Sequence, residues 1–401
     1  DAKGKPFLLT CDSSILVLGP PGSGKDRRVA IPLLEAWPGP ALATSTKVDL
    51  ALATVAARAR RGPVAVFDPA GFGLGGPEPV RWNPVLGCQD RDVAARRAAA
   101  IIAGGTGPAE KFWDVLAARV LRACLAAAAW QGEGVLEAAR FASSLGGWST
   151  AATILRANGE SEWAAGLDAD ADLDPRTSSS IMAAIAASTS GLSNSRLRVA
   201  LTPTDSDTDP AAVIAAGGTI YAVAPAEPDG HLVFRPWTTL LASEVAAVLR
   251  EQAHGERLCP PALLLLNELV HVCPLPELPG LLADGRGHNI ATVAIVQDPA
   301  QLAARYDADE AKAIIAAAQH RLLLAANGDD TAREWSELIG KYHITRKSTT
   351  HKTAQMVSES SSTSLEERPI MAASELRHLP YGCGVLLPRG FPSMPLQLQG
   401  S

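Results

Sequence analysis

The chain has 401 residues, of which 47% are hydrophobic and 19% are charged, and its formal net charge is −6. This composition is typical of a globular protein large enough for two domains, and it excludes a disordered chain or one built of membrane spans, because no apolar run reaches the width of a bilayer. The acidic balance excludes a general attraction to nucleic acid, so any contact with DNA has to come from a local basic patch or an assembled channel.

Six cysteines are scattered along the chain without the Cys-x-x-Cys spacing of a zinc site. They predict buried thiols in a reducing compartment. The sequence starts at Asp1, and no signal peptide is visible there. We therefore expect a soluble chain exposed to the cytosol, and the missing initiator methionine leaves room for a membrane segment upstream.

An apolar strand predicted at residues 15–18 runs into a glycine-rich loop that ends on a lysine. The spacing Gly19-x-x-x-x-Gly24-Lys25 is that of a P-loop, in which backbone N–H groups converge on phosphate oxygens and the lysine reaches the β- and γ-phosphates. A helix predicted over residues 27–37 adds its N-terminal dipole, although Pro32 marks a kink or an early end. The predicted nucleotide-binding residues are Gly19, Pro20, Pro21, Gly22, Ser23, Gly24, Lys25 and Asp26.

The alternative interpretation of this stretch is a glycine turn after a buried strand, which leaves the lysine unexplained. Asp26 stands where a Ser or Thr hydroxyl normally helps to hold Mg²⁺. A carboxylate at this position either takes part in a metal site or repels the phosphates and blocks it.

A second informative stretch is the apolar run at residues 260–266, which ends on Asn267 and Glu268. It matches a Walker B strand, where an aspartate binds Mg²⁺ and the next glutamate orients or deprotonates the attacking water. Asn267 carries no charge, so Mg²⁺ should bind weakly, whereas Glu268 remains a candidate base. If Asp26 and Asn267 face each other, a hydrogen bond between them could occupy the metal's space, and Lys25 could pair with Asp26 instead of phosphate.

Strands alternate with helices before residue 87 and again after residue 200, which predicts a parallel sheet with ligand-binding loops at the carboxyl ends of its strands. Residues 87–200 show Ala-rich helical periodicity instead, so we predict an all-α domain inserted into the α/β sheet. The acidic run 168–175 lacks the glycine and the terminal glutamate of a calcium-binding EF-hand, and a solvated turn is expected there.

Two further polar residues are candidates for function. Gln297 ends a predicted buried strand, where it either senses the γ-phosphate or makes a strand-end hydrogen bond. Arg286 lies in a predicted glycine turn. Its possible roles are an arginine finger, a DNA-facing residue in an oligomer, or a solvated cation. Other expectations are a strand at 197–202, a glycine turn at 284–289, a mobile Ser/Thr-rich loop at 345–364, and an edge strand at 385–388.

Taken together, several segments carry a resemblance to a known family. They are Gly19–Lys25, Thr44–Leu50, Phe67–Pro69, Trp82–Pro84, Gly217–Tyr221, Asn267–Glu268, Cys273–Pro276, Gly285–Gly287 and Val296–Gln301. In this order the chain resembles TraG/TraD-type conjugative coupling proteins over nearly its whole length. Those proteins are membrane-anchored, RecA-like ATPases of type IV secretion systems that can assemble as hexamers.

The resemblance implies a discontinuous RecA-like nucleotide-binding domain, residues 1–86 and 201–401, with residues 87–200 as the inserted all-α domain. It implies ATP and Mg²⁺ as cofactors, the metal being doubtful here. The implied partners are single-stranded DNA or protein substrates, relaxosome or secretion-channel proteins, and further copies in a homohexamer. The full-length protein would lie at the cytoplasmic face of the inner or cell membrane, held by a segment absent from this sequence.

By this resemblance, Lys25 would bind phosphate, Glu268 would be the catalytic glutamate, Gln297 would sense nucleotide, and Arg286 would serve a neighbouring subunit. The two departures, Asp26 and Asn267, both fall on the metal shell. Three functions therefore remain open: an ATP-driven substrate motor, a non-hydrolysing member that docks substrates, and a DNA-pumping ATPase of the FtsK/HerA type. The last accounts less well for the inserted helices.

Overall fold

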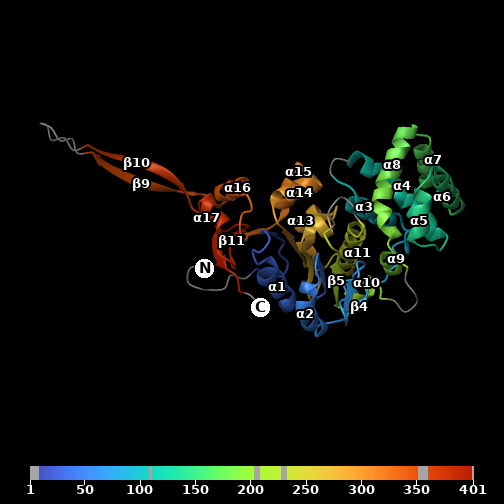
Figure 1. Cartoon of the computed structure of the whole chain (residues 1–401), viewed down its shortest axis with the longest axis horizontal. Helices are drawn as coiled ribbons and strands as arrows, with labels where there is room; N and C mark the ends of the chain where they lie inside the picture. Colours follow the sequence, from blue (N-terminus) through green and yellow to red (C-terminus); the bar gives the residue numbers. More distant parts are fainter. Residues whose placement is uncertain (1–8, 108–110, 203–207, 227–232, 351–359, 400–401) are drawn as a thin grey trace.

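The computed structural model describes residues 9–107, 111–202, 208–226, 233–350 and 360–399. The molecule is elongated, with a sheet in its middle, a group of helices at one end and a long hairpin at the other (Figure 1). Among the described residues, no helix combines the length and the apolar character that crossing a bilayer requires.

Ten strands form the central sheet, and those at its centre are short and mainly apolar. They are β1 (Ile15–Leu18), β2 (Ala41–Ser45), β3 (Val64–Phe67), β4 (Glu78–Pro79), β5 (Thr219–Val223), β6 (Ala262–Leu266), β7 (Ile290–Val296), β8 (His320–Leu323), β11 (Cys383–Pro388) and β12 (Met394–Gln397). Their order is β12-β11-β8-β1-β7-β6-β2-β5-β3-β4. From β8 to β4 all neighbours run parallel, and β11 is antiparallel to both β8 and β12.

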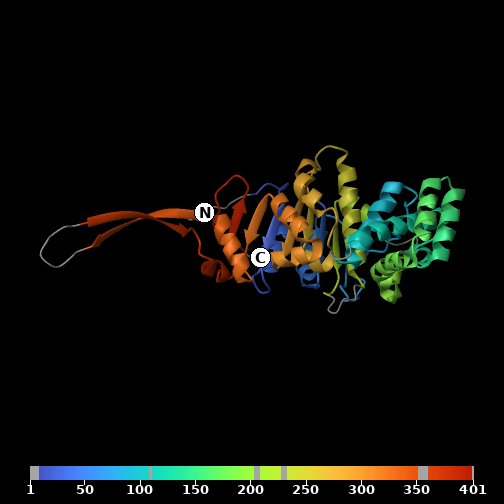
Figure 2. The same ribbon diagram turned by 90° about the horizontal axis from the view of Figure 1, so that it is seen from above.

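Helices cover both faces of the sheet (Figure 2), which is why the parallel strands read as continuous apolar runs. Leu34 and Leu50 pack with Val17 on one face, whereas Leu281 packs into the core that contains Leu16 on the other. These helices are α1 (Ile31–Ala36), α2 (Asp49–Ala59), α10 (Pro210–Ala215), α11 (Arg235–Ala253), α12 (Leu269–Val272), α13 (Leu278–His288), α14 (Pro299–Tyr306), α15 (Ala308–Ala317), α16 (Asp329–Ile339) and α17 (Ala373–Arg377). The predicted α/β architecture is confirmed.

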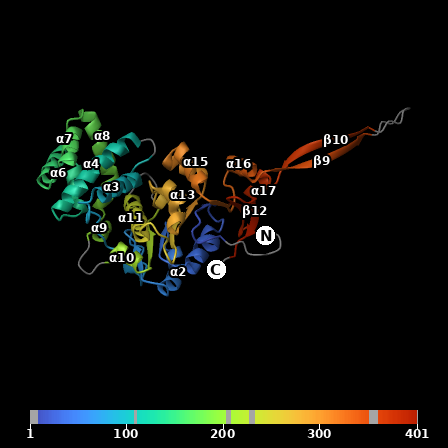
Figure 3. The same ribbon diagram turned by 180° about the vertical axis from the view of Figure 1, so that it is seen from behind.

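Between β4 and β5 the described residues from 91 to 200 are mainly helical and contain no strand. The helices are α3 (Arg91–Gly105), α4 (Lys111–Trp130), α5 (Val135–Ala142), α6 (Leu145–Ala157), α7 (Ser161–Ala171), α8 (Pro175–Thr189) and α9 (Ser195–Ala200). They gather at the end of the molecule far from the hairpin (Figure 3). All-helical structure in this region agrees with the sequence periodicity.

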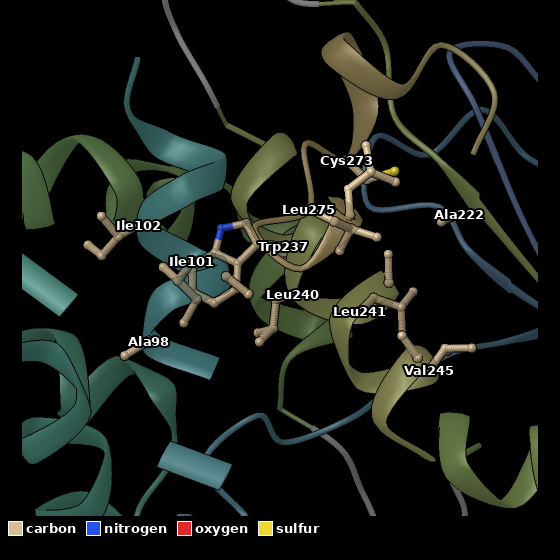
Figure 4. Close-up of a cluster of buried hydrophobic side chains, with 14 of the residues drawn as sticks. Ala98, Ile101, Ile102, Ala222, Trp237, Leu240, Leu241, Val245, Cys273 and Leu275 are labelled. Atoms are coloured by element: carbon tan, nitrogen blue, oxygen red, sulfur yellow. The ribbon is translucent and has the colours of Figure 1, made fainter. Parts of the chain in front are cut away.

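The helical region joins the sheet region through α3, which packs against α11. Ile101 of α3 faces Trp237 and Leu240 of α11, and the apolar cluster continues to Cys273 (Figure 4). A buried ion pair adds to this contact, because Arg97 donates to Glu244 Oε1 at 2.7 Å and to Oε2 at 3.0 Å. Arg96 also donates to Glu244, at 2.8 Å.

Two predictions within the helical region are wrong. Residues 197–202 alternate like a strand, yet Ser195–Ala200 is helix α9, because Asn194 caps its first N–H groups. The acidic run 168–175 is not one solvated turn. Asp170 lies in α7, 1% exposed and paired with Arg119, and Asp174 caps α8. No group of potential metal ligands is found there or elsewhere among the described residues.

Three predictions near the carboxyl end are also wrong. The glycine turn at 284–289 is the last part of α13, where Gly285 permits close approach to the Ile290 carbonyl. Residues 345–350 and 360–364 are not a loop but belong to an antiparallel hairpin, β9 (Lys341–Thr350) and β10 (Ser360–Pro369); residues 351–359 lie outside the described part. β11 is not at the edge of the sheet, because β12 follows it.

Candidate nucleotide site

The glycine-rich loop follows β1 at the carboxyl edge of the parallel strands. Gly22 and Gly24 lie at φ 81° and 91°, a left-handed conformation that other residues rarely adopt. Alternation of such residues turns successive N–H groups to one side and makes an anion-binding nest. Among the described residues, neither glycine N–H finds an acceptor. The loop therefore has the local form that phosphate binding requires.

The loop leads into a helix of mixed type. One π-helical turn, Asp26–Ala30, precedes α1, and the Ile31 N–H donates to the Asp26 carbonyl five residues earlier. Pro32 lacks an N–H, so the ordinary bond to Arg28 cannot form. The change from the π turn to α1 lies next to Pro32, where the sequence predicts a kink or an early end. Such π turns are often found at functional sites.

Glu268 is held beside Lys25 by its backbone and by two partners. Its φ of 52° is left-handed, which is unusual for a residue other than glycine and typical of functional sites. Lys25 is 7% exposed, and its Nζ lies 3.3 Å from Glu268 Oε1. The Thr46 hydroxyl donates to Glu268 Oε2 at 2.7 Å. Burial alone would raise the pKa of Glu268, but Thr46 and Lys25 outweigh it and hold the pKa below its usual value. The carboxyl is therefore ionised at neutral pH.

Asp26 and Asn267 meet across the site. Asn267 Nδ2 donates to Asp26 Oδ1 at 2.8 Å. Asn267 is 2% exposed, and its backbone carbonyl accepts from the Thr44 hydroxyl at 2.9 Å, which fixes the end of β6. The hydrogen bond expected from the sequence is present, whereas the expected pairing of Lys25 with Asp26 is replaced by the Lys25–Glu268 pair.

The nest and Lys25 fit the phosphates of a nucleotide. Two buried oxygens beside them, Ser23 Oγ and Asn267 Oδ1, find no hydrogen-bond partner among the described residues. Such orphaned atoms are costly unless a ligand or water reaches them. The magnesium shell fits less well, because the Asp26 carboxylate already accepts from Asn267 and a metal would have to displace that bond.

The structure brings five of the predicted residues to one edge: Lys25, Asp26, Asn267, Glu268 and Gln297. Gln297 follows β7, which lies between β1 and β6, and its N–H donates to the Gln301 side chain at 3.2 Å. The neighbouring Val296 carbonyl accepts from the Gly19 N–H at 3.1 Å, which places Gln297 beside the loop.

Arg286 does not join this group. It lies near the end of α13, and its Nε is 3.3 Å from Asp12 Oδ2. Asp12 precedes β1, whereas the loop follows it, so Arg286 lies at the opposite edge of the sheet. With His320 and Arg389 it lines a cavity of about 360 Å³ there. Within one copy of the chain, Arg286 is not part of the nucleotide site.

The sequence reasoning gave Thr46 no role in the site. It follows β2, and β2 pairs with β6, so its hydroxyl lies next to Glu268. The signal that could have found it is a polar residue at the end of a strand that neighbours the Walker B strand.

The fold and this arrangement can be compared with known proteins. The family model described as type IV secretory system conjugative DNA transfer matches residues 2–397. The chain belongs to this family. No match is found among curated protein sequences.

Solved structures of the conjugative DNA transfer family and its neighbours share the fold. The unbound coupling protein TrwBdeltaN70 is 16% identical with a TM-score of 0.64, and the match covers 97% of this chain and 85% of that one. TrwB in complex with ADP and Mg²⁺ is 16% identical with a TM-score of 0.63, over 97% and 86%. VirB4 of Thermoanaerobacter pseudethanolicus is 12% identical with a TM-score of 0.52, over 100% and 95%.

These matches confirm the resemblance to TraG/TraD-type coupling proteins and the RecA-like fold with an all-helical part. At these identities the solved structures establish the fold alone.

Proposed function

We propose that this chain is the nucleotide-dependent part of a conjugative coupling protein, which recruits DNA or protein substrates and passes them to a secretion channel. The observation that supports it best is Glu268, ionised and held in a strained conformation between Lys25 and Thr46, beside an anion-binding loop. A structural glycine turn would need neither the buried lysine nor the strained glutamate. TrwB, which shares the fold, has been solved with ATP and GTP analogues and with ADP and Mg²⁺.

In this proposal ATP binds with its terminal phosphates on the loop. Lys25 then leaves Glu268 for the phosphates, because a triphosphate carries more negative charge than one carboxylate. Glu268, released from Lys25 and still bonded to Thr46, orients the attacking water and accepts its proton. Magnesium, when bound, would neutralise phosphate charge, with Asp26 and Asn267 as its nearest oxygen donors.

A second candidate is a member of the family that binds nucleotide and docks substrates without turnover. The Asp26–Asn267 hydrogen bond favours it, because Asn267 Nδ2 occupies the Asp26 oxygen that would otherwise be open to the metal. The proposals share ATP binding and differ in hydrolysis. We propose slow hydrolysis for the unmodified chain. A DNA pump of the FtsK/HerA type is disfavoured by the helical insertion.

We further propose that residues 1–86 and 201–401 act as the nucleotide domain and residues 87–200 as the inserted recognition domain. The apolar and ionic contacts of α3 with α11 would transmit changes between them. Arg286, which lies away from its own nucleotide site, suits a role toward the nucleotide of a neighbouring copy in a hexamer. Relaxosome and channel proteins would be the partners, at the cytoplasmic face of a membrane.

The experiment is calorimetry of ATP with the unmodified chain and with Lys25→Ala. We expect measurable binding that Lys25→Ala weakens at least tenfold, an effect of about 1.4 kcal/mol. Lys312→Ala is the control, because Lys312 is an exposed lysine of α15 that pairs with Asp309 on the same helix and not with a residue of the loop. Equal ATP affinities of the unmodified chain and Lys25→Ala would show that the loop does not bind phosphate.

A further inference from the structure

Tyr381 lies against the glycine-rich loop but has no part in the site described so far. It stands between α17 and β11, two residues before β11 begins. The guanidinium carbon of Arg28 is 5.2 Å from the centre of its ring. A Cβ atom on Gly24 would come within 3.0 Å of Tyr381 Cε2, so the ring edge touches the loop backbone. The residue is nevertheless 55% exposed.

The surroundings of Tyr381 are built to keep its ring in place. Gly382 lies at φ 80°, and a Cβ there would approach Arg28 Nε to 3.4 Å. Arg28 also reaches the Leu398 carbonyl, at 3.4 Å. A half-exposed aromatic ring held by an arginine from the phosphate-loop helix is therefore a fixed feature of this edge of the sheet.

The two sides of the loop differ in chemistry. Toward β7 and β6 lie Gln297, Asn267 and Glu268, which suit the charged end of a triphosphate. Toward β8 and β11 lie Leu324, whose Cδ1 would be 3.1 Å from a Cβ on Gly19, and Tyr381. A nucleotide with its γ-phosphate at Lys25 and Glu268 has to extend its nucleoside toward the apolar and aromatic side.

We propose that Tyr381, positioned by Arg28, is the surface on which the base of the bound nucleotide stacks. This inference rests on the proposed nucleotide binding and adds the part of the site that holds the base. Aromatic and guanidinium planes both stack on bases, and such stacking tolerates any base because every base has a π face. The site would thus discriminate little between bases and would take ATP and GTP with similar affinity.

The test separates the base from the phosphates. Calorimetry is performed with ATP and with inorganic triphosphate on the unmodified chain, Tyr381→Ala and Tyr381→Trp. We expect Tyr381→Ala to weaken ATP about tenfold and to leave triphosphate unchanged, and Tyr381→Trp to keep ATP binding. Tyr342→Ala, in the hairpin and similarly exposed, is the control and should change neither ligand.

The possible failures are distinct. Unchanged ATP affinity of Tyr381→Ala, or an equal loss for ATP and triphosphate, would overturn the stacking role while leaving nucleotide binding intact. Absence of ATP binding to the unmodified chain would overturn the proposed function and the stacking role together. Because Tyr381 is more than half exposed, Tyr381→Ala should melt at the temperature of the unmodified chain, which a thermal denaturation measured alongside establishes.

Discussion

Replacement of Asn267 by aspartate should turn the hydrogen-bonded pair Asp26–Asn267 into two carboxylates that repel each other. The change removes the hydrogen bond from Nδ2 to Asp26 Oδ1. A hydrogen bond to a charged group contributes about 1.5–3 kcal/mol. It also brings two carboxylates into contact, and like charges about 4 Å apart repel by roughly 4 kcal/mol at an effective dielectric constant of about 20.

Solvent reduces the repulsion, because Asp26 is exposed even though Asn267 is buried. We therefore expect Asn267→Asp to lower the free energy of unfolding by about 2–4 kcal/mol without Mg²⁺. The double change Asp26→Thr with Asn267→Asp should recover most of that loss, because it restores one hydroxyl and one carboxylate.

The assay is urea denaturation of the four proteins of this cycle, with and without Mg²⁺, followed by calorimetry of ATP in the presence of Mg²⁺. The double variant should gain more Mg²⁺-dependent ATP affinity than either single variant. Unchanged stability of Asn267→Asp without Mg²⁺ would refute the reasoning about the pair. Robust Mg²⁺-dependent ATP hydrolysis by the unmodified chain, abolished by Glu268→Gln, would refute the conclusion that this pair weakens turnover.

Two other predictions concern charged side chains. Glu244→Gln should cost about 3 kcal/mol of unfolding free energy in urea denaturation, because it leaves Arg97 buried without its charge partner. The control Glu137→Gln, at a half-buried glutamate whose partner Arg140 is exposed, should cost less than about 0.5 kcal/mol. Burial would raise the pKa of Glu244, but the arginines outweigh it and lower that pKa below 4.5. This stability is therefore present above pH 4.5 and is lost as the pH falls through the lowered pKa, so the deficit of Glu244→Gln should shrink there; a constant deficit from pH 7 to pH 3 would contradict this. Arg286→Ala should leave the calorimetric ATP affinity of a single chain unchanged, because Arg286 contacts Asp12 at the far edge of the sheet; a tenfold loss would contradict this placement.

The architecture could be predicted because its signals are local. Apolar runs of four to seven residues separated by helical periods define the parallel sheet, and the loss of that alternation defines the helical region. The prediction of a strand at 197–202 is wrong because a period of two can also occur in a short helix. The cap at Asn194 favours the helix over the strand. The pair Gly285 and Gly287 predicts a turn, whereas in the structure Gly285 allows a close helix–strand contact.

The Ser/Thr-rich segment after residue 344 was predicted as a loop because it has no apolar period. The hairpin extends away from the body of the molecule (Figure 1), and the pairing of Lys341–Thr350 with Ser360–Pro369 defines it. Periodicity reports which side of a strand is buried, so a strand pair without a buried side cannot be recognised by it.

The sequence predicts those residues of the site that occupy fixed positions in a known motif. Lys25, Glu268 and the Asp26–Asn267 pair follow from motif spacing together with the chemistry of carboxylates and amides. Thr46 and Tyr381 could not be found in this way, because Thr46 contacts Glu268 and Tyr381 contacts Gly24, and each of these partners is far away along the chain. Arg286 lies in Gly285–Gly287, one of the segments of the family resemblance, but it pairs with Asp12 at the opposite edge of the sheet. The spacing of motifs does not reveal at which edge a residue lies.

The hairpin of β9 and β10 begins and ends at one point of the molecule, where the Ile370 N–H donates to the Gly340 carbonyl at 3.0 Å. Two strands of ten residues each give it a reach of roughly 33 Å. Because both ends leave the body side by side, its length can vary among related sequences without moving the sheet or the nucleotide loop. The length of the β9–β10 hairpin can therefore change to suit a partner outside the molecule without changing the nucleotide site.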